Sequence, residues 1–141
     1  MIAPRVLAPG FAVTGQVRLG DLPEIAAHYR ALINNRPDDE EPGQPSSADL
    51  ETAARGLGLD YTYIPISGEI ADKDVAAFVK AILNTRGPTL AFCRTGNRSA
   101  SVWALSQRGK RSAKRILAAA ANAGYDLGSL EPRLLQTAPV K

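Results

Sequence analysis

The sequence contains few of the residues that build disulfide bonds and zinc sites. It has one Cys and one His among 141 residues. One Cys cannot form a disulfide within the chain, and one Cys with one His cannot supply the several ligands of a zinc site built from these residue types. We therefore expect no metal and no organic cofactor, and a free thiol of the kind that persists in a reducing compartment.

A long apolar segment is also missing. No run in the sequence approaches the roughly 18 apolar residues that a membrane-spanning helix requires. Pro4, Pro9 and Gly15 interrupt the beginning of the chain before a signal-type segment develops. These absences predict a cytoplasmic protein with no membrane partner.

Positive and negative charges are nearly balanced. The 17 Lys and Arg residues against 14 Asp and Glu residues leave a net charge of +3, which is too small for the basic surface of a nucleic-acid-binding protein. The distribution is uneven, because four consecutive acids occupy residues 38–41 whereas basic residues concentrate after residue 93. We expect a small anionic substrate and no nucleic-acid partner.

Length and composition predict one folded domain over residues 1–141. The sequence is 45% hydrophobic and 22% charged, as in an ordinary soluble globular protein, and a single core commonly serves about 100–150 residues. Apolar runs predict strands over 31–34, 61–66 and 89–92. Helical periodicity predicts helices over 22–29, 47–57, 75–83, 97–106 and 113–123, and a helical C-terminal segment at about 110–137 that packs on the rest.

The alternation of strands and helices indicates the fold class. It is typical of an α/β domain in three layers, in which helices flank a mainly parallel central sheet. The helix over 75–83 is expected to end at a turn of Arg86, Gly87 and Pro88. Ligands of such sheets bind beyond the carboxyl ends of the strands. Cys93 follows strand 89–92 at that end.

The segment 93–99, Cys-Arg-Thr-Gly-Asn-Arg-Ser, has the composition of an anion-binding loop. Gly96 permits the positive φ of a tight turn, and the following helix contributes its positive end. Arg98 can bind an oxyanion through two N–H groups. A thiol at Cys93 is expected to ionise in this field, with Ser99 as a hydrogen-bond donor to the sulfur. No Pro interrupts the backbone N–H groups of the loop, which belong to Arg94, Thr95, Gly96, Asn97 and Arg98.

A lone Cys is commonly just a small buried hydrophobic residue. Here the Cys follows an apolar strand, and it is followed by a Gly at the third place, an Arg at the fifth place and a helix. This combination favours a functional thiol over a packing residue.

The loop 93–99 and the segment 33–46, Ile-Asn-Asn-Arg-Pro-Asp-Asp-Glu-Glu-Pro-Gly-Gln-Pro-Ser, resemble the phosphatase-like domain of beta-lactamase hydrolase-like proteins. The resemblance covers nearly the whole chain. It implies the fold of protein tyrosine and dual-specificity phosphatases, with the Cys loop between a central strand and a helix. It also implies that Cys93 is the nucleophile, that Arg98 binds the anion, and that Asp38 is the best match to a general acid.

Members of this family suggest a second chemistry. Some are described as sulfur transferases, and in fused members the partner is a metallo-hydrolase domain that acts on persulfides. This chain lacks that partner and its metal ligands. The resemblance therefore implies a persulfide-oxidising metallo-hydrolase or a sulfide-oxidising enzyme as a partner protein.

The loop departs from that of tyrosine-type phosphatases, which it otherwise resembles. Those proteins carry His before the Cys and five residues between Cys and Arg, whereas here Phe92 precedes Cys93 and four residues intervene. The shorter loop resembles that of rhodanese-type sulfurtransferases, which hold a persulfide sulfur. A smaller loop should enclose a smaller group, so we predict sulfane-sulfur transfer from a persulfide or thiosulfate to a thiol as the main activity.

Two alternatives stay open. In the first, the protein is a phosphatase that cleaves a phosphate ester through a phosphocysteine, with Asp38 as the general acid and Arg36 in a supporting role. The neighbouring acids, Asp39, Glu40 and Glu41, are more simply interpreted as a solvated, charged turn. In the second alternative the loop is not catalytic, and it serves as an anion-binding or thiol redox-sensing module.

Overall fold

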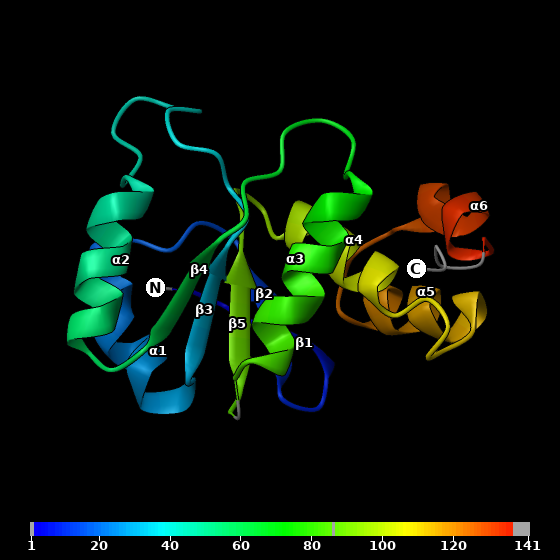
Figure 1. The fold of residues 1–141 in the computed structure, drawn as a ribbon, viewed down its shortest axis with the longest axis horizontal. Coiled ribbons are helices and arrows are strands. Elements are labelled where there is room, and N and C mark those ends of the chain that lie inside the picture. Colours follow the sequence, from blue (N-terminus) through cyan, green and yellow to red (C-terminus); the bar gives the residue numbers. More distant parts are fainter. Residues whose placement is uncertain (1, 86, 137–141) are drawn as a thin grey trace.

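The computed structural model describes residues 2–85 and 87–136 (Figure 1). Arg86 of the expected turn, and residue 137 at the expected end of the C-terminal segment, lie outside the described residues. The strands are β1 (Arg5–Ala8), β2 (Phe11–Thr14), β3 (Ala31–Asn34), β4 (Asp60–Tyr63) and β5 (Thr89–Phe92). The α-helices are α1 (Leu22–His28), α2 (Ser47–Gly56), α3 (Asp72–Leu83), α4 (Asn97–Ser106), α5 (Ala113–Asn122) and α6 (Glu131–Leu134), and short 3₁₀ helices precede α1 and α6 as η1 (Leu19–Asp21) and η2 (Gly128–Leu130).

The sheet is mainly parallel, as the sequence predicts. Its strand order is β1-β2-β5-β3-β4, and only the β1–β2 pair is antiparallel. In the register of the parallel strands, Phe92 lies opposite Thr14 on one side and Asn34 on the other. The segments that follow β2, β3 and β5 therefore emerge side by side at one edge of the sheet, with Cys93 at the centre.

Helices cover both faces of the sheet and complete the three layers. Alternate residues of β5 face opposite sides: Leu90 and Phe92 pack with α1 and α2, whereas Ala91 packs with α3 and α4. The helices α5 and α6 lie beyond α4, at the far end of the molecule from α2 (Figure 1). The α/β fold with helices on both faces of the sheet is confirmed.

The hairpin β1–β2 was absent from the sequence-based prediction. Pro9 and Gly10 form its turn, and Gly10 adopts a φ of 77° that favours glycine. The residues of β2 are all buried because this strand pairs with the central strand β5. The first strands of the sheet thus precede the first predicted helix, and the predicted order of elements began one hairpin too late.

Local signals fix several element boundaries. Ser46 accepts a hydrogen bond from the Asp49 amide at 3.1 Å and so caps α2, as its position in the sequence predicts. The edge strand β4 ends at Tyr63, earlier than the predicted 61–66. Beyond it the Ile64 and Ile66 amides still donate to the Asn34 and Asn35 carbonyls at 2.9 Å and 3.0 Å, on either side of Pro65, which has no amide hydrogen to donate. Within the described residues, no helix combines the length and apolarity needed to cross a membrane.

Candidate active site

Cys93 lies directly after the central strand β5 and before α4. Its side chain is fully buried, and the Gly96 amide donates a hydrogen bond to the Cys93 sulfur at 3.0 Å. An amide that points at the sulfur stabilises negative charge there. The loop therefore holds the thiol in the electrostatic setting of a nucleophile.

Gly96 is required at its position for two reasons. Its φ is 95°, and it is the residue immediately before the first turn of α4. A Cβ on Gly96 would overlap the Tyr125 hydroxyl and come within 3.3 Å of the Thr14 carbonyl oxygen. The loop can therefore approach Tyr125 and β2 this closely only with glycine.

Tyr125 is a site residue that the sequence analysis missed. It follows α5, and its hydroxyl donates to the Thr95 carbonyl at 3.4 Å. Burial, and next the electrostatic effect of the nearby Cys93 side chain, raise the pKa of Tyr125. No local motif marks this Tyr, because only the packing of the C-terminal helices on α4 carries it to the Cys loop.

The rest of the loop faces outward. Arg94, Thr95 and Asn97 are exposed, and the Arg94 carbonyl accepts a hydrogen bond from the Gln16 amide at 3.2 Å. The amides of Arg94 and Thr95 have no hydrogen-bond partner among the described residues. They therefore remain available to an anion bound at the loop.

Arg98 is held by a carboxylate and a carbonyl. Its Nη1 donates to Glu40 Oε2 at 2.7 Å and to the Ile66 carbonyl at 2.9 Å, and its Nη2 donates to Glu40 Oε1 at 2.9 Å. The hydrogen bond with Glu40 raises the pKa of Arg98 against the opposing effect of burial, and the proximity of the Cys93 side chain adds to the rise. The structure thus brings Cys93 and Arg98 together and places a carboxylate on the guanidinium.

Arg36 organises the acidic segment, and its predicted supporting role in the site stays a prediction. Its side chain is 3% exposed, and the guanidinium donates to Glu40 at 2.8 Å, to Glu41 at 2.7 Å and to the side-chain oxygen of Gln16 at 2.8 Å. Burial opposes the charge of Arg36, but the two hydrogen bonds to carboxylates outweigh it and raise its pKa. Glu40 and Glu41 thus lie on an exposed turn, as expected from the sequence, and their carboxylates are also held by arginines.

Asp38 is hydrogen-bonded to the start of α2, and no hydrogen bond joins it to the Cys loop among the described residues. Its Oδ1 accepts a hydrogen bond from the Ser47 amide at 2.8 Å, at the start of α2, and its own amide donates to the Tyr63 hydroxyl at 2.9 Å. The acid that contacts Arg98 is Glu40. Hydrogen bonds from Arg98 and then from Arg36 lower the pKa of Glu40 to about 2, against the opposing effect of burial. The acid role of Asp38 stays a prediction.

Ser99 makes a different hydrogen bond from the predicted one. Its hydroxyl donates to the side-chain oxygen of Asn35 at 2.8 Å, so its single proton is not directed at Cys93 here. Both residues are fully buried, and the Asn35 side-chain nitrogen donates to the Ile64 carbonyl at 3.0 Å. Asn35, which the sequence analysis left without a role, thereby ties the start of α4 to the segments after β3 and β4.

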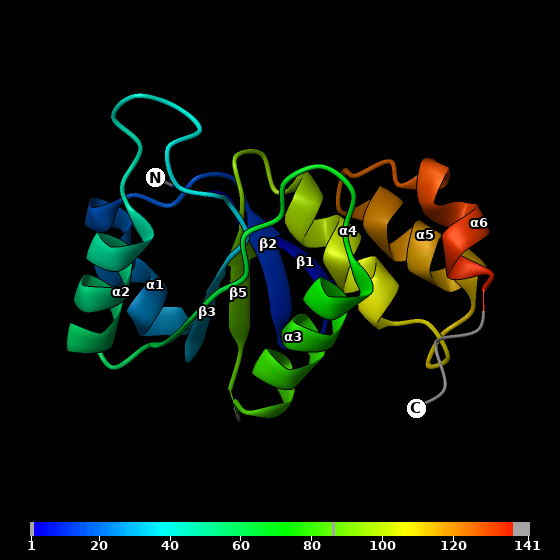
Figure 2. The same ribbon diagram turned by 45° about the horizontal axis from the view of Figure 1, so that its top comes forward.

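An open hollow of about 620 Å³ adjoins the loop. Asn97, Arg98 and Ser101 form one side of it, and Arg133 of α6 contributes to the other. The segments 64–71 and 35–46 extend at the same end of the molecule as the Cys loop (Figure 2). A ligand anchored at Arg98 would have room to extend into this hollow.

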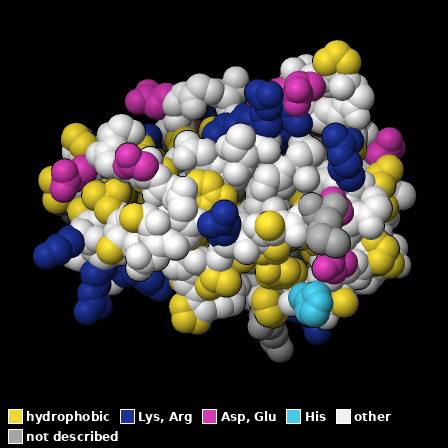
Figure 3. All heavy atoms as spheres, turned by 180° about the vertical axis from the view of Figure 1, so that it is seen from behind, with side chains coloured by type: hydrophobic (Ala, Val, Ile, Leu, Met, Phe, Trp, Pro, Cys, Tyr) yellow, Lys and Arg dark blue, Asp and Glu magenta, His cyan; other side chains and the backbone are white. Residues whose placement is uncertain are grey.

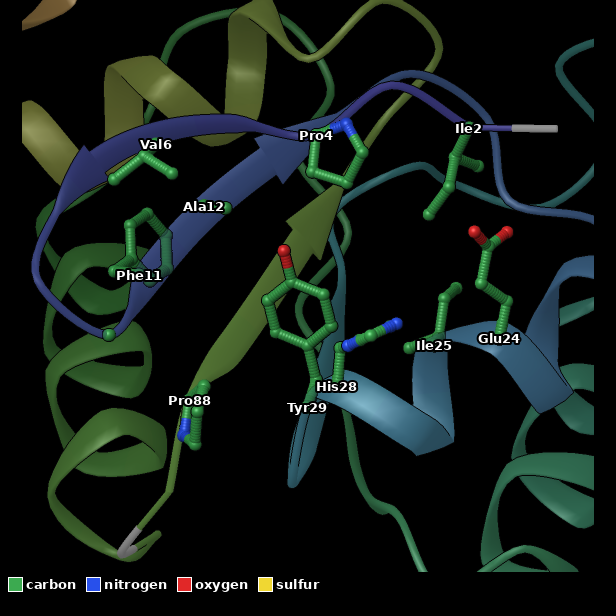
Figure 4. Close-up of a pocket in the computed structure, with 11 residues that line it drawn as sticks. Ile2, Pro4, Val6, Phe11, Ala12, Glu24, Ile25, His28, Tyr29 and Pro88 are labelled. Carbon is green, nitrogen blue, oxygen red and sulfur yellow. The ribbon is translucent and has the colours of Figure 1, made fainter.

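A second hollow lies far from Cys93, at the other end of the strands. It has a volume of about 460 Å³, and mainly apolar residues of the β1–β2 hairpin, α1 and the segment before β5 line it (Figure 4). His28 is among its lining residues and is exposed. Seen from behind, the single histidine lies on the surface beside a group of hydrophobic side chains (Figure 3). This hollow shares no residue with the Cys loop.

Sequence comparisons identify relatives of this chain. Residues 4–110 match the family described as "Beta-lactamase hydrolase-like protein, phosphatase-like domain". A beta-lactamase hydrolase-like protein of Xylella fastidiosa strain 9a5c is 37% identical over 134 residues, which cover 89% of this chain and 31% of that protein. One from Agrobacterium fabrum is 37% identical over 97 residues, covering 67% of this chain and 22% of that protein. The chain thus spans less than a third of the length of these relatives.

Solved structures agree with this relationship. A proposed phosphatase from Neisseria meningitidis Z2491 has a TM-score of 0.82 and 28% sequence identity, covering 93% of this chain and 95% of that one. Kinase associated phosphatase shares the fold at 13% identity, with a TM-score of 0.76 and coverage of 96% and 92%. These comparisons favour the phosphatase alternative and give no support to sulfur transfer, which stays a prediction. The chain belongs to the family of phosphatase-like domains of beta-lactamase hydrolase-like proteins.

Proposed function

We propose that this protein is a cysteine-dependent phosphatase that cleaves phosphate monoesters. The observation that carries the proposal is the loop 93–98, in which a buried thiol receives the Gly96 amide and Arg98 lies at the same helix start. Family membership adds support, as does the fold shared with kinase associated phosphatase, whose catalytic site contains a cysteine. Amides, a helix N-terminus and a guanidinium are the groups that bind a phosphoryl dianion.

The first step forms a phosphocysteine. The Cys93 thiolate attacks phosphorus, the bond from phosphorus to the ester oxygen breaks, and the departing oxygen takes a proton from the carboxyl group of Asp38. Amides of the loop and Arg98 hold the non-bridging oxygens, which carry the charge of the transition state. Asp38 would have to leave its hydrogen bond to the Ser47 amide for this step.

The second step releases phosphate. Water attacks phosphorus, its proton passes to the Asp38 carboxylate, and the bond between phosphorus and sulfur breaks to regenerate the thiolate. The hollow beside Arg98, which includes Ser101 and Arg133, would receive the part of the substrate beyond the phosphoryl group. The hollow is open, and both polar and apolar residues line it, which suits a soluble ester.

The test is hydrolysis of a small aryl phosphate by the purified chain. We expect turnover by the wild type and a loss of at least about a thousandfold in Cys93→Ser, because the nucleophile is removed. Rapid quenching and intact mass spectrometry should detect one added phosphoryl group on the wild type only. An active Cys93→Ser variant would refute the proposal.

The acid role of Asp38 needs a separate test. Asp38→Asn should slow hydrolysis of an ester with a poor leaving group by about a hundredfold, but should have much less effect on an ester whose leaving group needs no proton. Equal rates for the wild type and Asp38→Asn on both esters would remove Asp38 from the mechanism.

Sulfane-sulfur transfer is the second candidate, favoured by the four-residue spacing between Cys93 and Arg98. The thiolate would attack the outer sulfur of a persulfide, the S–S bond would break with departure of a thiolate, and an acceptor thiolate would later remove that sulfur from Cys93. Intact mass spectrometry after exposure to thiosulfate or glutathione persulfide, followed by excess thiol, tests it. Repeated gain and discharge of one sulfur atom without ester hydrolysis would replace the phosphatase proposal, and no turnover of either substrate would indicate a binding or sensing module.

A further inference from the structure

Arg133 is a second guanidinium on the hollow beside Arg98. It belongs to α6, which packs on α4, and both arginines line the same hollow although they are far apart in the sequence. Arg98 binds the phosphoryl group in the proposed mechanism, whereas no group of the substrate has been assigned to Arg133. A guanidinium is the side chain best suited to bind carboxylate and phosphate groups. Arg133 is therefore a candidate for recognising another part of the substrate.

The guanidinium of Arg133 is held on one side only. Its Nη2 donates to Asp72 Oδ1, at the start of α3, at 3.2 Å. Its Nε and Nη1 donate no hydrogen bond within residues 2–85 and 87–136. The side chain is 22% exposed, so most of its stem is packed. Packing and the contact with Asp72 thus orient the guanidinium and leave donors free for a ligand.

The charges around Asp72 leave a positive surplus at Arg133. The same oxygen of Asp72 lies 3.8 Å from Nη2 of Arg108, whose side chain is 6% exposed. One negative charge thus meets two positive charges. Glu69, an exposed acid, also lines the hollow and opposes this surplus. Binding of an anion here therefore depends on the directed donors of Arg133 rather than on a broadly positive surface.

We infer that Arg133 binds a second anionic group of the substrate, a carboxylate or another phosphate, while the Cys93 loop binds the phosphoryl group that is removed. This inference rests on the proposed function, because it names the substrate class of the same site. Glu40 holds Arg98 through Nη1 and Nη2, just as Asp72 holds the second guanidinium through Nη2. The Nε of each arginine has no partner in the part of the chain that the structure describes, so each can bind an anion of its own.

The hollow has room for a substrate with two anionic groups. Its volume of about 620 Å³ is within the range of small-molecule sites, about 300–1,000 Å³, and accepts an aromatic ring between the two groups. The side chains of Asn97 and Ser129 also line it and make no hydrogen bond to other described residues. They can bind polar atoms that lie between the phosphoryl group and the second anion.

Binding of phosphonates, which are not hydrolysed, tests the inference without requiring turnover. Isothermal titration of the full chain compares para-phosphonobenzoate with para-phosphonobenzamide, which has the same shape but lacks the second charge. Another pair places the carboxylate or the amide two carbons farther from the ring. A further ligand, para-phenylene diphosphonate, offers a second phosphate-like group. The proteins are the wild type, Arg133→Gln, Arg133→Lys and the control Arg115→Gln.

Arg115 provides the matched control. It is exposed on α5, it does not line the hollow, and its side chain has no hydrogen-bond partner among the described residues. Arg115→Gln therefore removes the same charge without changing the donors at the hollow. Arg133→Lys keeps the charge but loses the planar fork of the guanidinium, so it separates the contribution of charge from that of geometry.

We expect the wild type to bind at least one carboxylate, or the diphosphonate, about three- to tenfold more tightly than the matching amide, the range of a partly exposed charge-assisted contact. Arg133→Gln should lose this preference and Arg133→Lys should keep part of it. Arg115→Gln should keep the preference within about twofold, since it changes only screened, longer-range charge. Circular dichroism establishes that each variant is folded. A gain with the diphosphonate alone would identify the second group as a phosphate.

The possible failures are distinct. Equal binding of all these ligands by the wild type, or a preference that Arg133→Gln retains, would overturn the inference and leave the proposed function standing. A preference that Arg115→Gln loses equally would also overturn it, because net charge alone would then explain the effect. A preference that depends on Arg133, in a protein that hydrolyses no phosphate ester, would support the inference and contradict the proposed function. Absence of phosphonate binding would overturn the inference, and together with absence of ester hydrolysis it would defeat both.

Discussion

Asn35 shows how a buried polar side chain can position the Cys loop without contacting the Cys93 sulfur. It is fully buried, donates to the Ile64 carbonyl at 3.0 Å and accepts from the Ser99 hydroxyl at 2.8 Å. Its own amide donates to the Phe92 carbonyl at 2.8 Å, next to Cys93. One residue thus connects the segment after β3 with β5, α4 and the segment after β4.

We predict that Asn35→Ala lowers the free energy of unfolding by about 2–4 kcal/mol, because the Ile64 carbonyl and the Ser99 hydroxyl lose buried partners. Urea unfolding followed by circular dichroism measures this loss. Asn122→Ala, at an exposed position at the end of α5, is the matched control and should change the free energy of unfolding by less than about 0.5 kcal/mol. Equal effects of the two substitutions would contradict the role assigned to Asn35.

At position 96, glycine avoids two different costs: the backbone strain of a positive φ and the steric overlap of a Cβ with a neighbouring side chain. We predict that Gly96→Ala impairs both stability and anion binding, because it combines strain at a φ of 95° with overlap of the Tyr125 hydroxyl. Gly109→Ala has a comparable φ of 81° with no atom within 4 Å of the added Cβ, so it should show only the strain, about 1–2 kcal/mol. Urea unfolding and sulfate titration measure both effects.

The double variant Gly96→Ala with Tyr125→Phe identifies the source of the additional loss. Removing the Tyr125 hydroxyl eliminates the nearest atom to the added Cβ but leaves the backbone strain. Sulfate binding should therefore recover in part relative to Gly96→Ala alone. No recovery would mean that backbone conformation, and not the approach of Tyr125, limits the loop.

At the scale of elements, sequence patterns identified the parts with regular periodicity. The 3.6-residue spacing of Val75 and Phe78 predicted α3, and the four buried residues of β5 appeared as an uninterrupted apolar run. The hairpin β1–β2 was missed because the turn residues Pro9 and Gly10 dominate the local pattern. Short strands depend on pairing with distant partners, which a local pattern does not contain.

The same distinction applies to the candidate site. Cys93 and Arg98 belong to one loop, so their spacing in the sequence determines that they lie close together. The acid that contacts Arg98 is Glu40, which lies 58 positions away in the sequence. It is one of several consecutive acidic residues, and the sequence alone does not distinguish among them. Whether Asp38 or Glu40 meets Arg98 depends on how the segment after β3 bends over Arg36, and no spacing rule determines that.

The acidic segment should make stability depend on pH in a defined direction. The pKa of Glu40 is lowered from 4.5 to about 2 by Arg98 and Arg36, so its ion pairs stabilise the folded state fully above about pH 4.5 and are lost as the pH falls through about 2. We predict that the wild type exceeds Glu40→Gln in free energy of unfolding by about 1 kcal/mol at neutral pH, as partly exposed pairs do.

Urea unfolding of both proteins over a series of pH values measures this prediction. The stability difference should shrink below pH 4.5 and disappear near pH 2, because a protonated Glu40 resembles Gln. A difference that stays constant with pH would show that Glu40 acts through packing or neutral hydrogen bonds rather than through its charge.

For the whole molecule, the question is whether the two sides of the sheet form one cooperative unit. One hydrophobic cluster joins the sheet to α1 and α2, and another joins it to the remaining helices. Leu90 and Ala91 are adjacent in β5 yet belong to opposite clusters. Because each central strand contributes to both clusters, loss of one should expose the sheet residues on which the other depends.

Leu50 and Trp103 test this coupling from opposite faces. Leu50 of α2 is fully buried in one cluster, and Trp103 of α4 is 1% exposed in the other. We predict that Leu50→Ala lowers the free energy of unfolding by about 2–5 kcal/mol, and that the urea midpoint from Trp103 fluorescence moves as far as the midpoint from far-ultraviolet circular dichroism. Leu83→Ala, at a position 73% exposed, should leave both midpoints nearly unchanged. A Trp103 transition that stays in place while the circular dichroism transition shifts would divide the chain into two independently unfolding halves. A common shift would mean that the Cys loop, which connects Phe92 of one cluster to Ala100 of the other, unfolds only with the whole domain.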